Sequence, residues 1–205
     1  MMSRRTRLFA LLLCAAALVG ACSPPSAPPL ATAEERAEAW ADWKTAKDSL
    51  FRGPASPLLP PDRDDFDSLS YFAYDSTLTF SIALDPALQL DTLRLATSTG
   101  EPRDYVRFGI LSFPLEGRRH RLTVFQPVDD DPTLFVPFTD ATNGRDTYRA
   151  GRYLDFEPAA GGRYVLDFNY AYNPYCAYNP AYSCPLPPAE NRLSIPVRAG
   201  ERVPG

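Results

Sequence analysis

One stretch near the C-terminus, residues 167–191, constrains the fold of this 205-residue chain more than any other part of it. It holds two of the four cysteines, five of the eleven tyrosines and two Asn-Pro pairs, Asn173-Pro174 and Asn179-Pro180. A proline restricts the residue before it to extended or turn conformations, so neither asparagine is expected in a helix. We therefore expect an ordered loop that packs on a domain, and not a flexible linker.

The composition favours short strands and turns over helices. The chain has 22 prolines, 12 phenylalanines and 11 tyrosines, and aromatic residues are typical of strands. Alternating or aromatic runs predict strands within residues 70–74, 78–84, 90–97, 105–115, 119–125, 134–138, 148–156, 163–168 and 192–197. Such a series indicates a mainly β fold, either an antiparallel β-sandwich or a partly open barrel.

One N-terminal α-helix is expected ahead of the strands. Thr32 can cap it, residues 34–51 have helical periodicity, and Gly53-Pro54 ends it. Trp40 and Trp43 could contact a ligand or a membrane, but we favour packing on the domain. The stripe expected to pack consists of Ala39, Trp43, Ala46 and Leu50, with Trp40 beside it.

The first 33 residues predict export and lipid anchoring. Three arginines precede an apolar run, residues 8–20, which has the length of a signal-peptide core and is too short to span a bilayer. The sequence Val19-Gly20-Ala21-Cys22 resembles the lipobox of bacterial lipoproteins, which implies a lipid on Cys22. We expect a lipoprotein signal peptide at 1–21, a lipid-anchored proline-rich tether at 22–33 and a single domain at 34–205. The alternative is ordinary cleavage, which would leave Cys22 as a free thiol.

Charge and histidine content narrow the possible partners. The formal charge is −4 and becomes about −7 when the three arginines of the leader are removed. An acidic chain without a basic run is a poor nucleic-acid binder. The only histidine, His120, argues against zinc sites and Ser-His-Asp chemistry. We expect no metal, no cofactor and no nucleic acid, and a membrane contact only through the lipid.

Three runs carry a resemblance to a known family. Residues 135–140, 147–154 and 167–191 resemble the bacterial family called domain of unknown function 1684, and the resemblance extends from about residue 34 to 201. The family implies a small envelope or cytosolic module. It has no established activity, so the resemblance implies no catalytic residues. Together with the leader, it leads us to expect a protein anchored in a bacterial envelope, at the outer membrane.

The two cysteines of the loop predict a disulfide. Cys176 and Cys184 are eight residues apart in a chain that we expect in an oxidising compartment. A bridge across so short a loop would stabilise the fold by roughly 2–3 kcal/mol. A redox or metal pair is the alternative, but there is no Cys-x-x-Cys spacing and no nearby histidine.

The loop and its surroundings, residues 140–191, offer a polar pocket with tyrosine walls, suited to sugars or other neutral polar ligands. The same polar groups could instead only satisfy the loop's own backbone, and we weigh this structural role ahead of the pocket. Arg152 could bind an anion, although we prefer an Arg152–Asp167 pair that holds the loop. The candidate binding residues are Arg152, Asp167, Asn169, Tyr172, Asn173, Glu190 and Asn191.

Three functions remain open at this point. The first is a non-catalytic module that binds a polar ligand or an envelope protein. The second is a hydrolase of an envelope glycan or ester that uses Asp167 and Glu190, since paired carboxylates with split pKa values perform acid–base hydrolysis. The third is a purely structural envelope protein.

Overall fold

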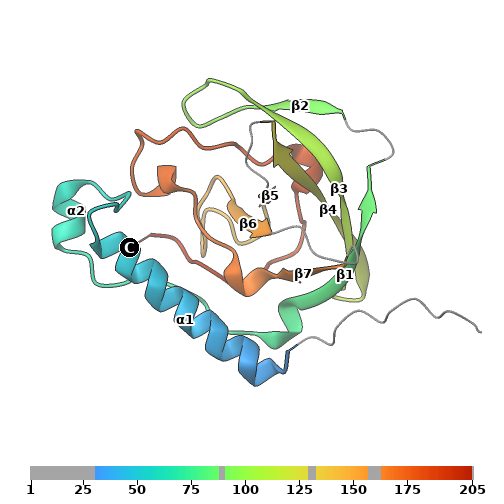
Figure 1. The fold of residues 1–205 in the computed structure, drawn as a ribbon, viewed down its shortest axis with the longest axis horizontal. Coiled ribbons are helices and arrows are strands. Elements are labelled where there is room, and N and C mark those ends of the chain that lie inside the picture. Colours follow the sequence, from blue (N-terminus) through green and yellow to red (C-terminus); the bar gives the residue numbers. More distant parts are fainter. Residues whose placement is uncertain (1–30, 88–90, 129–132, 157–162, 205) are drawn as a thin grey trace, which may run out of the picture.

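The computed structural model describes residues 31–87, 91–128, 133–156 and 163–204 (Figure 1). The predicted signal peptide, the lipidation site Cys22 and most of the tether lie outside these residues. Within the described ranges, no helix has both the length and the apolar character needed to cross a bilayer.

The predicted N-terminal helix is α1, Ala33–Arg52. Its first turn is closed by a capping box, in which the Thr32 hydroxyl accepts from the Glu35 amide at 3.2 Å and the Glu35 carboxylate accepts from the Thr32 amide at 2.7 Å. Gly53 caps its other end, as predicted. A short second helix, α2, Pro60–Asp64, follows.

The face that α1 packs on the domain agrees with the predicted stripe at Trp40 and Trp43 and differs from it elsewhere. Trp40 and Phe51 are buried, whereas Ala39, Ala46 and Leu50 are exposed. Trp40 instead donates from its indole nitrogen to the carbonyl of Asn169 at 2.8 Å. The packed face therefore carries Trp40, Lys44, Lys47 and Phe51 at helical spacing. The predicted stripe was right at Trp40 and Trp43, whose rings pack on Tyr71. It was wrong at its other members, because two of the residues facing the domain are lysines, which an apolar pattern omits.

The β part is one antiparallel sheet that curls into a half-barrel. Its strand order is β6-β5-β4-β3-β1-β7, and β2 pairs with β3. The strands are β1 (Thr79–Pro86), β2 (Thr92–Leu95), β3 (Arg103–Leu115), β4 (Arg118–Pro127), β5 (Leu134–Phe138), β6 (Arg152–Phe156) and β7 (Arg163–Asp167). The mainly β fold with an N-terminal helix is confirmed, and of the two predicted architectures the partly open barrel is the one found.

Two local features let the sheet curl. The pairing of β3 with β4 shifts register between Arg107 and Gly109, and a Cβ on Gly109 would lie 2.7 Å from the carbonyl oxygen of Asp85, so glycine is required there. Strand β1 also changes partner, pairing with β7 through Thr79–Ala83 and with β3 through Leu84–Pro86.

The loop after β7 brings the two ends of the sheet together. The backbones of Tyr172 and Tyr153, on β6, exchange hydrogen bonds of 2.9 and 3.0 Å. The predicted strands at 70–74 and 192–197 are reduced to single bridges, Tyr71 with Glu201 and Thr139 with Arg192. The core fills the inside of the curl with residues such as Leu111, Phe113, Leu122, Val136, Phe138 and Phe168.

The expectation that residues 167–191 form an ordered loop is confirmed. The loop contains three 3₁₀ turns, Phe168–Tyr170, Tyr175–Ala177 and Ala189–Asn191. Several of its side chains are buried, among them Phe168, Asn169, Asn173, Cys184 and Asn191. In Figure 1 it begins beside α1 at the end of β7 and then crosses the open side of the curl toward β3 and β4.

Candidate functional site

Arg152 is a structural residue, and its predicted pairing with Asp167 is wrong. Its fully buried guanidinium pairs with Asp140 at 2.9 Å and also donates to the carbonyls of Val197, Ala199 and Glu201. Burial lowers the pKa of Arg152 below its usual value, and Asp140 acts in the opposite direction. Asp140 is the partner because it lies two residues beyond Phe138, which pairs with Arg152 across β5 and β6.

Three more predicted binding residues are committed to backbone groups. Asn191 accepts from the Thr123 amide at 2.7 Å and donates to the carbonyls of Thr123 and Pro137, both at 2.8 Å. Asn169 exchanges hydrogen bonds of 2.9 Å with the backbone of Asp75. Asp167 in turn accepts from Asn169. These side chains join β4 to β5 and anchor the turn after β7, so they perform the structural role considered as the alternative.

The two carboxylates proposed for hydrolysis are not brought together. Asp167 is buried at the turn after β7, whereas Glu190 is exposed and pairs with Arg107 at 3.2 Å. Against the effect of burial, Glu190 and Asp91 raise the pKa of Arg107. Among the described residues, no contact and no shared partner joins Asp167 to Glu190.

Cys176 and Cys184 are free thiols in the structure and do not form the predicted disulfide. They are nevertheless adjacent, since the Cys176 amide donates to the Cys184 sulfur at 3.2 Å. Burial and a hydrogen bond with Cys176 raise the pKa of the Cys184 thiol to about 12. A protonated thiol is a poor nucleophile, so Cys184 is not activated for nucleophilic attack at neutral pH.

A buried ionic network around Glu201 was not predicted, because no motif in residues 200–205 indicates a buried charge. The Glu201 carboxylate is fully buried and forms an ion pair with Lys47 of α1. It also accepts from the Asn173 amide at 2.7 Å, the Tyr178 hydroxyl at 3.0 Å and the Tyr71 hydroxyl at 3.4 Å. The one sequence signal was Lys47, a charged residue at helical spacing from Trp40 that would need a partner once packed.

Asn173 belongs to the same network and is not a free binding group. Its side-chain nitrogen, Nδ2, donates to the Arg202 carbonyl at 2.7 Å and to the Tyr178 hydroxyl at 3.2 Å. Gly200 allows the close approach that this requires, since a Cβ there would lie 2.3 Å from the carbonyl oxygen of Ala171. The network therefore fastens α1, the loop and the C-terminal segment to one another.

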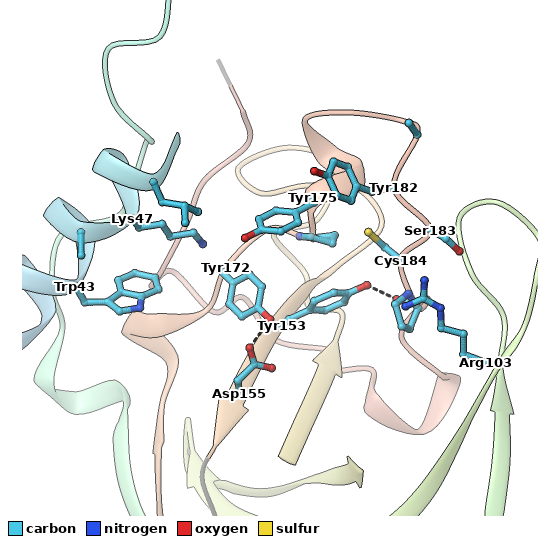
Figure 2. A pocket seen from close by; sticks show the side chains of 15 residues that line it. Trp43, Lys47, Arg103, Tyr153, Asp155, Tyr172, Tyr175, Tyr182, Ser183 and Cys184 are labelled. Carbon is cyan, nitrogen blue, oxygen red and sulfur yellow. Dashed lines mark hydrogen bonds between the residues drawn. The ribbon is translucent and has the colours of Figure 1, made fainter. Parts of the chain in front are cut away.

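A cavity of about 840 Å³ lies beside the network, between α1, β6 and the loop (Figure 2). Of the predicted binding residues only Tyr172 lines it. Its other walls come from four parts of the chain: Trp43, Ala46, Lys47 and Leu50 of α1, Arg103 of β3, Tyr153 and Asp155 of β6, and Pro174, Tyr175 and residues 181–185 of the loop.

At the end of the cavity next to α1, the lining side chains interact with one another. The Tyr172 hydroxyl donates to Asp155 at 2.5 Å, and the Lys47 ammonium lies 4.4 Å from the centre of the Tyr172 ring and 5.1 Å from that of Trp43. Burial lowers the pKa of Lys47, and Glu201 acts in the opposite direction. Burial also raises the pKa of Tyr172, so its hydroxyl remains a donor at neutral pH.

The rest of the cavity is an open aromatic surface. Tyr175 and Tyr182 pack edge to face with ring centres 5.2 Å apart, and 38% and 37% of their surfaces remain exposed. Within the described part of the chain, neither hydroxyl forms a hydrogen bond, and no group of three His, Cys, Asp or Glu side chains could hold a metal ion. The arrangement suits stacking and hydrogen bonding to a ligand.

The curled sheet, the packed helix and the cavity define a small β half-barrel protein with a pocket beside its N-terminal helix. A family model described as "Protein of unknown function (DUF1684)" matches residues 64–202, so the chain belongs to this family. The predicted family is thereby confirmed.

One solved structure gives a close comparison. It is the solution NMR structure of the uncharacterized protein from gene locus rrnAC0354 of Haloarcula marismortui. It is 39% identical, covers 82% of this chain and 97% of its own, and has a TM-score of 0.64. A comparison with curated proteins gave no match.

Proposed function

We propose that this protein is a bacterial lipoprotein, anchored through Cys22 at the outer membrane, whose β domain binds a small polar ligand without transforming it. The cavity between α1 and the loop carries the binding part of this proposal. Its volume of about 840 Å³ lies in the range of known small-molecule sites, which combine apolar walls with a few polar groups. The leader and the Val19-Gly20-Ala21-Cys22 motif support the anchoring part.

The lining of the cavity supports binding more than catalysis. Asp155 is held by Tyr172, and the Cys184 thiol has a pKa of about 12, so neither supplies a ready base or nucleophile at neutral pH. His120 contacts the carbonyl of Leu115 on the β3–β4 hairpin and does not line the cavity. Two tyrosine rings that are partly exposed at the cavity wall favour binding over a purely structural role.

Ligand binding should appear as thermal stabilisation of the full chain in detergent. At 100 times its dissociation constant, a ligand raises the free energy of unfolding by about 2.7 kcal/mol. The panel would contain neutral sugars, acidic sugars and peptidoglycan fragments. Tyr182→Ala should abolish the shift because it removes a cavity wall, whereas Leu186→Ala, on the same loop and equally exposed but outside the cavity, should retain it. An unchanged melting temperature with every class would count against a ligand site.

Export should produce two covalent modifications, a lipid on Cys22 and a disulfide in the loop. Expression of the full chain in a bacterium should place a fatty-acid label on wild-type protein and none on Cys22→Ser.

We also propose that the adjacent Cys176 and Cys184 become bridged in the oxidising compartment. Mass spectrometry should then show their peptide lighter by two hydrogen atoms, and bridging should add roughly 2–3 kcal/mol of stability. A label that persists in Cys22→Ser would contradict anchoring, and free thiols in exported protein would contradict bridging.

A further inference from the structure

We propose that the ligand of the cavity carries an oxyanion, a carboxylate or a phosphate on a ring, and that Arg103 binds this group. The inference rests on the proposed function, since it assigns the ligand class of the same cavity. The cavity has two cationic side chains in its lining, Lys47 and Arg103. The two differ in whether a carboxylate of the protein already pairs with their charge.

Lys47 is not available to a ligand anion. Its ammonium is ion-paired with the fully buried Glu201 and covered by the Tyr172 and Trp43 rings. Asp155 lies near enough to act on the pKa of Lys47 as well. The α1 end of the cavity therefore has one cation among two carboxylates, and it disfavours a further negative charge.

Arg103 lies across the cavity from α1, beside Cys184 (Figure 2). Its side chain is exposed, and it forms no ion pair with any residue that the structure describes. Its charge reaches the Cys184 thiol, whose pKa it lowers against the larger effect of burial. Arg103 is thus a cation on the cavity wall whose charge the described side chains leave unpaired.

The start of β3 fixes the position of Arg103. Arg103 pairs with Leu95 of β2 and lies on the same face of β3 as Tyr105. Both neighbours are buried, and Tyr105 stacks on Phe135 with ring centres 5.6 Å apart. The backbone of Arg103 is therefore held by packed neighbours, so its side chain extends toward the cavity from a fixed point on the sheet.

The side chains between Arg103 and α1 suit a ligand that contains a ring. Tyr175 and Tyr182 offer two faces and two hydroxyls that are not used by other described side chains. A guanidinium forms paired hydrogen bonds with a carboxylate or a phosphate, and aromatic faces pack on the apolar face of a sugar ring. The arrangement thus fits an acidic sugar or a sugar phosphate with its oxyanion at Arg103.

Calorimetric titration of the full chain in detergent tests this inference with four probes: glucose, glucuronate, glucose 6-phosphate and inorganic phosphate. One charged sugar should bind at least about tenfold more tightly than glucose, and which one does so distinguishes carboxylate from phosphate. Arg103→Gln should reduce that affinity to the level of glucose. Arg94→Gln, which alters an exposed arginine paired with Asp104 outside the cavity, should leave it unchanged.

The remaining outcomes separate the two proposals. Equal affinity for glucose and both charged sugars, unaffected by Arg103→Gln, would overturn the oxyanion inference and leave ligand binding intact. Inorganic phosphate binding as tightly as glucose 6-phosphate would overturn the part assigned to the ring. The absence of binding by all four probes would overturn the oxyanion inference, and only a failed thermal panel would also remove the proposed function.

Discussion

Replacement of Arg152 by methionine should lower the free energy of unfolding by about 3–5 kcal/mol, the loss expected when one partner of a buried ion pair is removed. Methionine keeps the length of the side chain but leaves Asp140 charged and without a counter-ion in a fully buried site. It also removes the donor to the carbonyls of Val197, Ala199 and Glu201. Urea denaturation followed by circular dichroism would measure the change.

Two further variants make the Arg152 result specific. Arg94→Met breaks an exposed pair with Asp104 and should cost no more than about 1 kcal/mol. Combining Arg152→Met with Asp140→Asn should recover part of the loss, because the stranded charge is removed. Wild-type stability in Arg152→Met would contradict a structural role and would restore the sequence-based hypothesis that this arginine serves a ligand.

Replacement of Glu201 by glutamine should cost a similar amount, about 3–5 kcal/mol, and should loosen α1 in particular. Glutamine preserves the shape of the side chain but leaves the Lys47 ammonium without its counter-charge. Its amide nitrogen would also replace an oxygen that accepts hydrogen bonds in the network. Since both tryptophans lie on α1, a red shift of tryptophan fluorescence should accompany the loss of stability.

The control for this variant is Glu190→Gln, which alters an exposed glutamate paired with Arg107 and should leave both stability and fluorescence near wild type. The double variant Lys47→Met with Glu201→Gln should be more stable than Glu201→Gln alone. If Glu201→Gln keeps the fluorescence and denaturation midpoint of the wild type, the carboxylate does not hold the helix.

Local patterns predicted the sheet well because they depend on neighbouring residues. Gly117 and Asn143-Gly144 are turn signals in the sequence, and both glycines have positive φ, 71° and 80°. Gly109 interrupts the predicted strand 105–115, and the pairing of β3 with β4 shifts register next to it. The predicted strand 192–197 was wrong for a non-local reason. Leu193 and Ile195 form only isolated backbone hydrogen bonds, with Thr139 and Ala141 beyond β5, and the carbonyl of Val197 accepts from the buried Arg152.

The site was harder to predict than the sheet. The asparagines of the loop stood out, but Asn169, Asn173 and Asn191 are buried and bonded to backbone, and this could only be known once their partners were placed. Arg103 has no distinguishing neighbours in the sequence, and the helical spacing of Lys47 from Trp40 does not identify its partner. Their roles depend on tertiary contacts among α1, β3 and the loop, and periodicity in a single sequence does not show contacts between distant segments.

The attachment of α1 also bears on the kinetics of folding. The bonds that hold the helix and the network join residues far apart, with a sequence separation of 129 in Trp40–Asn169 and of 130 in Tyr71–Glu201. Contacts of this separation close large loops and form late, whereas the β3–β4 hairpin closes through two residues, Glu116 and Gly117. We therefore expect the hairpin to form early and α1 to dock only after the loop and Glu201 are in place. Weakening the Lys47–Glu201 pair should then act mainly on the unfolding rate, so we expect the helix to govern how long the folded domain persists.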